Sequence, residues 1–277
     1  MNKSKLTRTS SLTLVGALGL LTLSSVAASD HTTNGMLKET DMVGISFWIA
    51  TAMMLASTVF FILERNNVAA KWKTSMTVAA LVTGIAWYHY TYMREHWVAT
   101  EESPLVMRYI DWLITVPLQV SEFYLILAAI GAASAVLFWK LFGASIVMLV
   151  AGFLSESSIE AVDGMETPLF AIGVLAWLYI IYELWAGEAK EKVSDASEGT
   201  QFAFKAMAGI LTVGWAIYPL GWLMGQDATD SAIENLNILY NIADVVNKTA
   251  FGMMVWYAAT MDTKASSSCL LYTSDAA

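Results

Sequence analysis

The sequence predicts an all-α fold: a bundle of seven transmembrane helices with the N-terminus outside the cell and the C-terminus in the cytoplasm. Of the 277 residues, 57% are apolar and 14% are charged, whereas a soluble domain carries about 25% charged residues. Seven apolar segments are long enough to cross a bilayer, and the connections between them alternate in charge. The net charge of −9 argues against nucleic acid as a partner, because phosphate binding requires clustered Lys and Arg.

Residues 1–29 have the pattern of a secretory signal peptide. Lys3, Lys5 and Arg8 form a basic start, an apolar stretch covers residues 12–23, and small residues precede position 30. The alternative is a first transmembrane helix, but about 12 apolar residues are few for a hydrocarbon core of about 30 Å. We therefore expect the mature chain to begin outside the membrane.

The membrane domain is expected to occupy residues 30–264. Residues 265–277 show no periodicity and are predicted to be a disordered tail or a remnant of cloning or sequencing. The chain has one cysteine, Cys269, so an intrachain disulfide is impossible. Neither a Gly-rich phosphate loop nor the Cys/His spacing of a metal site occurs in the sequence.

The seven apolar segments are expected to be helical, because lipid offers the backbone no hydrogen-bond partners. The connections are short, and they leave no room for a second domain. The cores of the predicted spans are residues 42–63, 75–97, 105–129, 135–154, 168–186, 204–225 and 234–260.

The charges of the connections predict the orientation independently of the signal peptide. The odd connections carry Arg65, Lys71, Lys73, Lys190, Lys192 and Lys205, and Lys140 lies near the third connection. The even connections are mainly acidic, with Glu101, Glu102, Glu156, Glu160, Asp163, Glu166, Asp227, Asp230 and Glu234. The positive-inside rule places the odd connections in the cytoplasm, which agrees with an outer N-terminus and seven crossings.

Spans three and seven contain ionisable residues, each of which costs about 2.5–3.5 kcal/mol on insertion near a helix centre. Asp111 and Glu122 are eleven residues apart, so they share a helix face at a separation of roughly 16 Å. Thr115 lies one turn from Asp111 on that face. These side chains must face one another or an internal cavity, and the ionisable set is Arg108, Asp111, Glu122, Asp244 and Lys248.

A lysine in apolar surroundings can form an imine with an aldehyde, and Lys248 fits that description. The alternative for Lys248 with Asp244 is a structural ion pair, although loss of hydration often cancels the attraction in such pairs. Glu122 stands alone on the cytoplasmic side, either as a proton donor or as a neutral acid that is hydrogen-bonded in the core. Arg108 could join the cluster or extend to the outer surface.

At these positions the sequence resembles the proteorhodopsins, within the microbial rhodopsins. The likeness runs from about residue 42 to residue 262, and a lysine in the last span together with this third-span pattern is highly specific. The stretches that carry the resemblance are residues 83–90, 108–113, 122–124, 182–188, 214–219 and 241–244, followed by Lys248.

The resemblance implies that Lys248 binds all-trans retinal covalently as a protonated Schiff base. It implies that Asp111 is the primary counterion and proton acceptor, Asp244 the second counterion and Glu122 the proton donor. By the same resemblance, Arg108 belongs to the counterion network, Thr115 to the proton path, and His89 pairs with the acceptor. A lone membrane histidine could equally be a packing residue.

The resemblance also implies the walls of a retinal pocket. The matching positions are Trp112, Met148, Trp177, Trp215, Tyr218 and Tyr240, although aromatic residues in membrane helices often serve packing or interfacial belts instead. Gln119 resembles the residue of the blue-absorbing type, since a polar group near the imine favours the charge distribution of the ground state. Pro219 removes a backbone hydrogen bond and should kink the sixth span.

The function implied by the resemblance is a light-driven outward proton pump in the inner membrane of a bacterium. Its partners would be the lipid bilayer and protons, and a homo-oligomeric ring, a pentamer or hexamer, is implied by the resemblance only. The alternative is a light-sensing photoreceptor on the same scaffold, which would not need the carboxyl group of Glu122.

Other ion pumps and chromophore-free proteins fit the sequence less well. Chloride pumps usually lack the acid at position 111, and sodium pumps replace this Asp-Thr-Glu set by Asn-Asp-Gln. A substrate transporter or ligand receptor without a chromophore would leave Lys248 unexplained.

Overall fold

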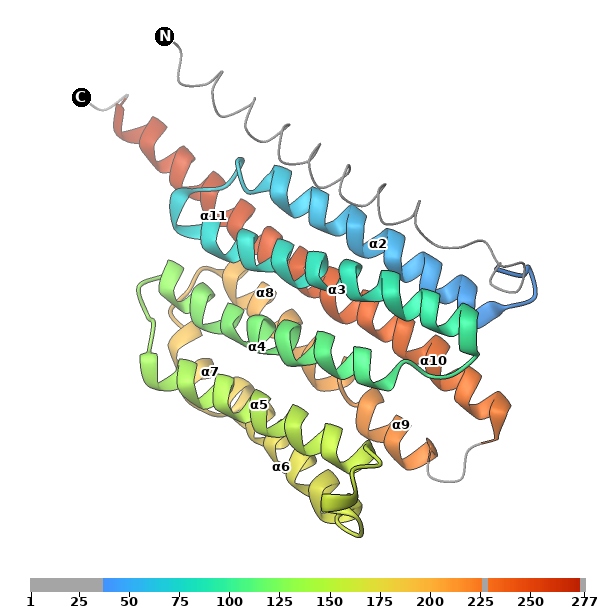
Figure 1. The fold of residues 1–277 in the computed structure, drawn as a ribbon. Helices are drawn as coiled ribbons and strands as arrows, with labels where there is room; N and C mark the ends of the chain where they lie inside the picture. The colour runs from blue at the N-terminus through green and yellow to red at the C-terminus, as the bar shows by residue number, and fades with distance from the viewer. Residues whose placement is uncertain (1–36, 226–228, 275–277) are drawn as a thin grey trace. The chain divides into compact units, whose positions relative to one another are not determined.

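The computed structural model describes residues 37–225 and 229–274. In these ranges the chain is helical and contains no strand, so the predicted all-α fold is confirmed (Figure 1). Five of the seven transmembrane helices are α2 (Met42–Glu64), α3 (Lys73–Thr100), α4 (Leu105–Ala129), α5 (Ala135–Glu156) and α6 (Glu166–Trp185).

The sixth and seventh helices are each built from three consecutive elements. The sixth helix consists of α8 (Glu198–Gly209), η3 (Ile210–Gly214) and α9 (Ile217–Gly225). The seventh consists of α10 (Asp230–Val245), η4 (Val246–Ala250) and α11 (Phe251–Ser274). The connections contain the short elements η1 (Ala70–Trp72), η2 (Glu160–Val162) and α7 (Glu188–Val193).

Within the described residues, five helices are long and apolar enough to cross a membrane by length and composition alone. They are α2, α4, α5, the stretch Glu166–Val193 and the stretch Glu198–Gly225. The second and seventh helices fall outside this group because they carry polar residues such as His89, Arg94, Asp244 and Lys248.

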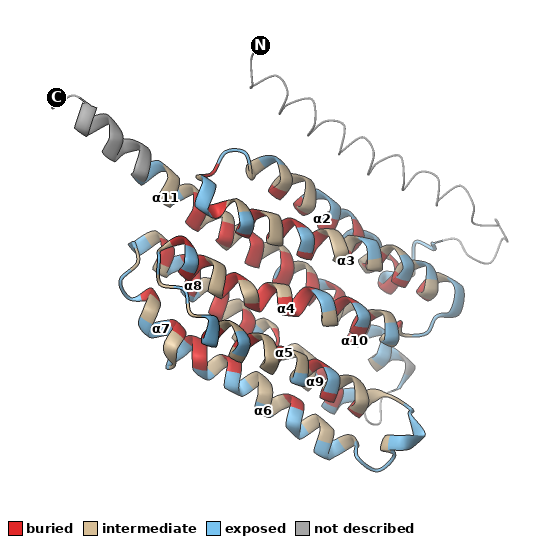
Figure 2. Ribbon diagram, turned by 60° about the vertical axis from the view of Figure 1, so that its left-hand side comes forward, coloured by how far each residue is buried: buried red, intermediate tan, exposed pale blue. Residues whose placement is uncertain are grey.

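The helices close into a bundle whose buried residues face inward (Figure 2). α2 packs on α3, α3 on α4, α4 on α5 and α5 on α6, while α8 packs on α11 and α10 packs back on α2. In α4, 61% of the most apolar window is buried, against 22–33% in the other four apolar spans. The third helix therefore lies at the centre of the bundle, as its polar residues require.

Two π-helical turns interrupt the sixth and seventh helices: η3 ends at Gly214, and η4 contains Lys248. Such turns often occur at functional sites, because they free backbone groups from the regular hydrogen-bond pattern. After η3, the sixth helix is interrupted again at residues 215–216. Pro219 is the third residue of α9 and has no backbone N–H group to donate to that turn. The interruption therefore lies where the sequence predicts a kink.

Helix ends differ from the apolar cores that the sequence predicts. The sixth helix begins at Glu198 rather than near 204, because the hydroxyl group of Ser197 accepts a hydrogen bond from the backbone N–H of Thr200 and caps it. α11 continues to Ser274, through much of the segment expected to be disordered; that stretch contains neither Gly nor Pro to end a helix. The foreign origin of residues 265–277 and the orientation of the termini stay predictions, and residues 1–29 lie outside the described part.

Candidate functional site

The centre of the candidate site is one buried lysine between two buried carboxylates. The Nζ atom of Lys248 lies 3.1 Å from Oδ2 of Asp111 and 2.9 Å from Oδ2 of Asp244. The lysine is 2% exposed, and both aspartates are fully buried. The structure therefore brings together three residues that the sequence places on two different helices.

Asp111 has few strong partners besides the lysine. The Nδ1 atom of His89 lies 3.1 Å from Oδ1 of Asp111, so the histidine and the predicted acceptor are in contact. The hydroxyl group of Thr115 donates mainly to the backbone oxygen of Asp111, at 2.9 Å, and only distantly to Oδ2, at 3.5 Å. Because a carboxylate has about four acceptor sites, Asp111 retains room for a further hydrogen-bond donor.

Asp244, in contrast, is held by three neutral donors in addition to Lys248. Tyr90 donates to its Oδ2 at 2.9 Å and Tyr218 to its Oδ1 at 2.5 Å, while Nε1 of Trp112 lies 3.3 Å from both oxygens. Several hydrogen bonds to one carboxylate favour its charged form. Asp244 is therefore surrounded by more hydrogen-bond donors than Asp111 is.

Arg108 is fully buried, so the alternative that it extends to the outer surface is wrong. Its NH2 atom donates to the side-chain oxygens of Asn237, at 3.0 Å, and Asn241, at 2.8 Å. In the described part of the chain no carboxylate lies within ion-pair distance of it, and its link to Asp244 runs through Tyr90, at 3.5 Å. Arg108 therefore belongs to the counterion network only indirectly.

Tyr90, Asn237 and Asn241 are functional-site residues that the sequence prediction missed. The spacing of Asn237, Asn241, Asp244 and Lys248 along the seventh helix is four, three and four residues, which places all of them on one helical face. This spacing can be read from the sequence, and it could have predicted that the two asparagines belong to the site.

Glu122 is 1% exposed and lies on the same helix as Asp111. Neither of its carboxyl oxygens has a hydrogen-bond partner in the described part of the chain; Ser75 is close enough to act on the group, but outside hydrogen-bond geometry. Ser75 is therefore the side chain with which an acid hydrogen-bonded in the core would pair. A buried polar group without a partner is unfavourable for folding, which favours a functional reason for its presence.

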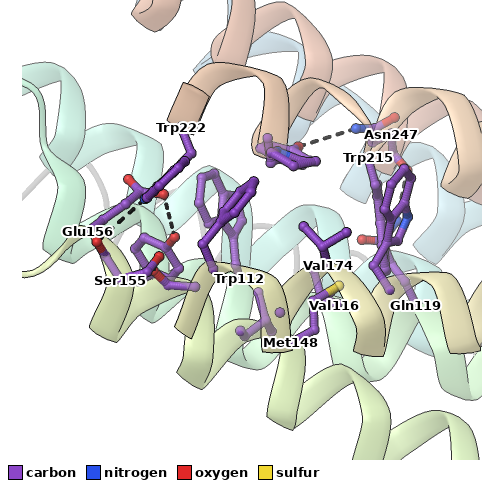
Figure 3. Close-up of a pocket in the computed structure, with 18 of the residues that line it drawn as sticks. Trp112, Val116, Gln119, Met148, Ser155, Glu156, Val174, Trp215, Trp222 and Asn247 are labelled. Carbon is purple, nitrogen blue, oxygen red and sulfur yellow. Dashed lines mark hydrogen bonds between the residues drawn. The ribbon is translucent and has the colours of Figure 1, made fainter. Parts of the chain in front are cut away.

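A pocket with a cavity volume of about 90 Å³ extends from Lys248 and is lined by the third, fourth, fifth and sixth helices (Figure 3). Small-molecule pockets commonly have mainly apolar walls. Trp215, Asn247 and Gln119 lie toward one end, and Trp222, Ser155 and Glu156 toward the other. Of the predicted wall residues, the pocket is lined by Trp112, Met148, Trp177, Trp215 and Tyr218, together with Gln119 and Lys248.

Tyr240 is the exception among the predicted wall residues, since it does not line the pocket. It lies two turns before Lys248, at the level of Arg108, whose guanidinium carbon is 5.4 Å from its ring centroid. Its ring stacks on Tyr218 at a centroid distance of 5.7 Å. Tyr240 thus packs against the pocket residue Tyr218 but does not line the pocket.

The sequence prediction missed the remaining wall residues, because which face of each helix borders the pocket depends on how the helices pack. A Cβ atom at Gly173 would lie 3.2 Å from the backbone oxygen of Met148, so a larger residue there would press on the pocket wall. At the far end, Phe170 stacks on Trp222 at 4.0 Å. The missed lining residues are Tyr109, Val116, Leu149, Gly152, Ser155, Glu156, Phe170, Gly173, Val174, Pro219, Trp222 and Asn247.

The family model described as bacteriorhodopsin-like protein matches residues 41–261, which include every element of this site. The chain belongs to that family.

Two relatives of this bacteriorhodopsin-like protein have nearly equal similarity to it. A green-light absorbing proteorhodopsin of Gamma-proteobacterium EBAC31A08 is 52% identical over 229 residues, which cover 82% of this chain and 90% of that protein. A blue-light absorbing proteorhodopsin of Gamma-proteobacterium Hot 75m4 is 51% identical over 253 residues, which cover 90% of this chain and 98% of that protein. The two identities therefore do not distinguish between the green-light and the blue-light absorbing relative.

The fold comparison agrees with the sequence comparison. The crystal structure of the blue light-absorbing proteorhodopsin from Med12 is 52% identical to this bacteriorhodopsin-like chain, with a TM-score of 0.66. The match covers 80% of this chain and 100% of that one.

Proposed function

We propose that this bacteriorhodopsin-like protein is a light-driven outward proton pump that binds all-trans retinal covalently through Lys248. The observation that carries the proposal is the Nζ atom of Lys248 between Asp111 and Asp244 at the end of a mainly apolar pocket. The multi-pass chain would act in the inner membrane of a bacterium. On resemblance alone, we also propose a homo-oligomeric ring, a pentamer or hexamer.

The residues of the pocket fit retinal. A buried primary amine is the group that condenses with an aldehyde, and the flat side chains of Trp112, Trp177 and Trp215 suit a conjugated chain. Gln119 donates from Nε2 to the backbone oxygen of Asn247 at 2.7 Å, which holds its amide near Lys248. When bound, retinal supplies the absorption of visible light and a double bond whose isomerisation turns the N–H bond of the Schiff base.

The first proton transfer would run from the nitrogen of Lys248 to Asp111. Oδ2 of Asp111 is 3.1 Å from that nitrogen, and the transfer converts a buried ion pair into two neutral groups. Asp244 keeps its charge, because Tyr90, Tyr218 and Trp112 continue to donate to it. The outward step therefore uses the carboxylate with fewer partners.

The second transfer would restore the proton of the Lys248 nitrogen from Glu122. This carboxyl group lies eleven residues beyond Asp111 on α4, on the side that the connection charges predict to be cytoplasmic. Donor and acceptor thus lie on opposite sides of Lys248, so that each cycle moves a proton outward. A light-sensing photoreceptor, the second hypothesis, would have no use for a buried acid without a partner.

Replacing Glu122 by Gln tests the pump against the photoreceptor. The substitution preserves shape but removes the acidic proton, and loss of a positioned proton donor slows such a step by about 10²–10⁴-fold. Flash spectroscopy of the purified pigment should show this delay in the recovery of the visible band, and a small diffusible acid such as azide should shorten it. Glu198→Gln, an exposed change at the start of α8, is the matched control. Unchanged recovery in Glu122→Gln would move the photoreceptor hypothesis to first place.

Replacing Gln119 by Leu should shift the absorption maximum to longer wavelength. A polar amide near the Lys248 nitrogen stabilises the ground state, whose positive charge lies there, more than the excited state. The absorption spectrum of the purified pigment measures the shift. Gln201→Leu, which alters a glutamine bound to the backbone oxygens of Ser194 and Ala196, should leave the spectrum in place. An unchanged maximum in Gln119→Leu would contradict the assignment of this residue to colour tuning.

A further inference from the structure

Asn247, the residue before Lys248, connects three parts of the site without belonging to the predicted set. It is 2% exposed. Its backbone oxygen accepts the hydrogen bond of Gln119, and its Nδ2 atom donates to the hydroxyl oxygen of Tyr218 at 3.2 Å (Figure 3). Tyr218 in turn donates to Oδ1 of Asp244. A hydrogen-bonded chain therefore runs from the side chain of Asn247 to one of the two counter-charges.

The amide donor of Asn247 determines the direction in which the hydroxyl proton of Tyr218 points. A phenol hydroxyl group has one proton and two acceptor lone pairs. Because the amide of Asn247 donates to one of the lone pairs, the proton of Tyr218 is directed to Asp244. Consecutive hydrogen bonds in one direction also polarise and strengthen each other. Asn247 thereby reduces the negative charge that Asp244 presents to Lys248.

A glycine of the sixth helix leaves room for the amide of Asn247. A Cβ atom at Gly214 would overlap Oδ1 and lie 2.8 Å from Cγ of Asn247, so a larger residue at position 214 would displace this amide. Gly214 ends the π-helical turn η3, and Asn247 lies in the π-helical turn η4. The two irregular turns thus meet where the amide passes between the helices.

We propose that Asn247 is a positioning residue of the retinal site, which acts through Tyr218 on the charge of Asp244 and whose amide has room because residue 214 is glycine. The proposal rests on the proposed function, because its readout is the retinal pigment. It differs from the colour-tuning role of Gln119, since its route leads to the counter-charge and not directly to the chromophore.

The test is a double-mutant cycle on the absorption maximum of the purified pigment. Asn247→Ala should shift the maximum to shorter wavelength, because Asp244 regains negative charge near the nitrogen. In a Tyr218→Phe background, which lacks the hydroxyl group, Asn247→Ala should produce no further shift. If the shift persists in that background, Asn247 does not act through Tyr218 and the proposal is wrong. A shift of the single variant to longer wavelength also overturns it, because the amide would then accept the tyrosine proton.

Substitution of Gly214 provides a second, independent test by the same absorption measurement. Gly214→Ala should displace the amide and shift the maximum in the same direction as Asn247→Ala. In the double variant with Asn247→Ala the added methyl group has room, so Gly214→Ala should have no further effect and should recover any lost yield of pigment. Additive effects of the two substitutions would contradict the steric link between these residues.

Thr249→Ala is the matched control, since Thr249 lies in the same π-helical turn but pairs with Ser57, at 2.9 Å, on another side. The absorption maximum of Thr249→Ala should equal that of the unmodified pigment, and a shift as large as that of Asn247→Ala would assign the effect to the turn as a whole.

The outcomes distinguish failure of the proposed function from failure of the role proposed for Asn247. Failure of the unmodified protein to form a pigment with retinal would overturn the proposed function, whereas a pigment with the wrong pattern of shifts overturns only the role of Asn247.

Discussion

Replacing Lys248 by Arg is expected to abolish the visible pigment completely. A guanidinium group keeps the positive charge between Asp111 and Asp244 but does not give up a proton to become a nucleophile, so no covalent bond to retinal can form. Lys248→Ala would remove the charge as well, and breaking a buried pair in this way destabilises a protein by about 3–5 kcal/mol. The arginine variant therefore separates loss of attachment from loss of folding. The measurement is the visible absorption of purified protein after addition of all-trans retinal.

Two control variants show whether the loss of pigment in Lys248→Arg is specific to this lysine. Lys205→Arg, an exposed change on α8, should form the pigment normally. Lys248→Ala should regain a visible band when it is given the preformed imine of retinal and propylamine, which replaces the missing side-chain atoms. A stable pigment in Lys248→Arg that resists hydroxylamine as well as the unmodified pigment does would contradict attachment at this lysine.

Replacing Asp111 by Asn should stop proton pumping while the pigment survives. Asp244 still balances Lys248 at 2.9 Å, so retinal can bind. The proposed acceptor of the Lys248 proton is lost, however, and the hydrogen bonds to Asp244 from Tyr90, Tyr218 and Trp112 make that carboxylate a poor substitute. Flash spectroscopy should show no deprotonated species, and light should produce no pH change in a suspension of cells.

The control for this substitution is Asp163→Asn, which changes an exposed aspartate in the fourth connection and should pump at the unmodified rate. Continued pumping by Asp111→Asn at a comparable rate would show that Asp244, not Asp111, receives the proton. That outcome would also contradict the inference that hydrogen-bond saturation decides between the two carboxylates.

The fold and the charged centre could be predicted from the sequence because both follow from the high cost of polar groups in lipid. Continuous apolar segments predict spans, and Asp111, Glu122, Asp244 and Lys248 stand out because each is unfavourable where it lies. Helix periodicity then suffices to place Asp111 with Thr115, and Asp244 with Lys248, on common faces. For this reason the contacts around Lys248 could be anticipated between helices far apart in the chain.

The remaining features could not be predicted, because they depend on distances between helices. Whether Arg108 meets a carboxylate or the amides of Asn237 and Asn241 is decided by side-chain packing that no sequence pattern encodes. Likewise Tyr240 matches a family position, yet its ring stacks on the pocket residue Tyr218 and does not itself line the pocket. The π-helical turns at Gly214 and Lys248 have no sequence signature, although the close contact of Gly214 with Asn247 depends on them.

The most direct test of outward proton pumping is the pH of an unbuffered suspension of cells that express this chain with added all-trans retinal, recorded in light and darkness. The account predicts acidification of the medium in light, which is abolished by a protonophore and absent from cells with Lys248→Arg. A coloured pigment without any pH change would contradict the pump and favour the photoreceptor. Alkalinisation of the medium would contradict the direction of transport.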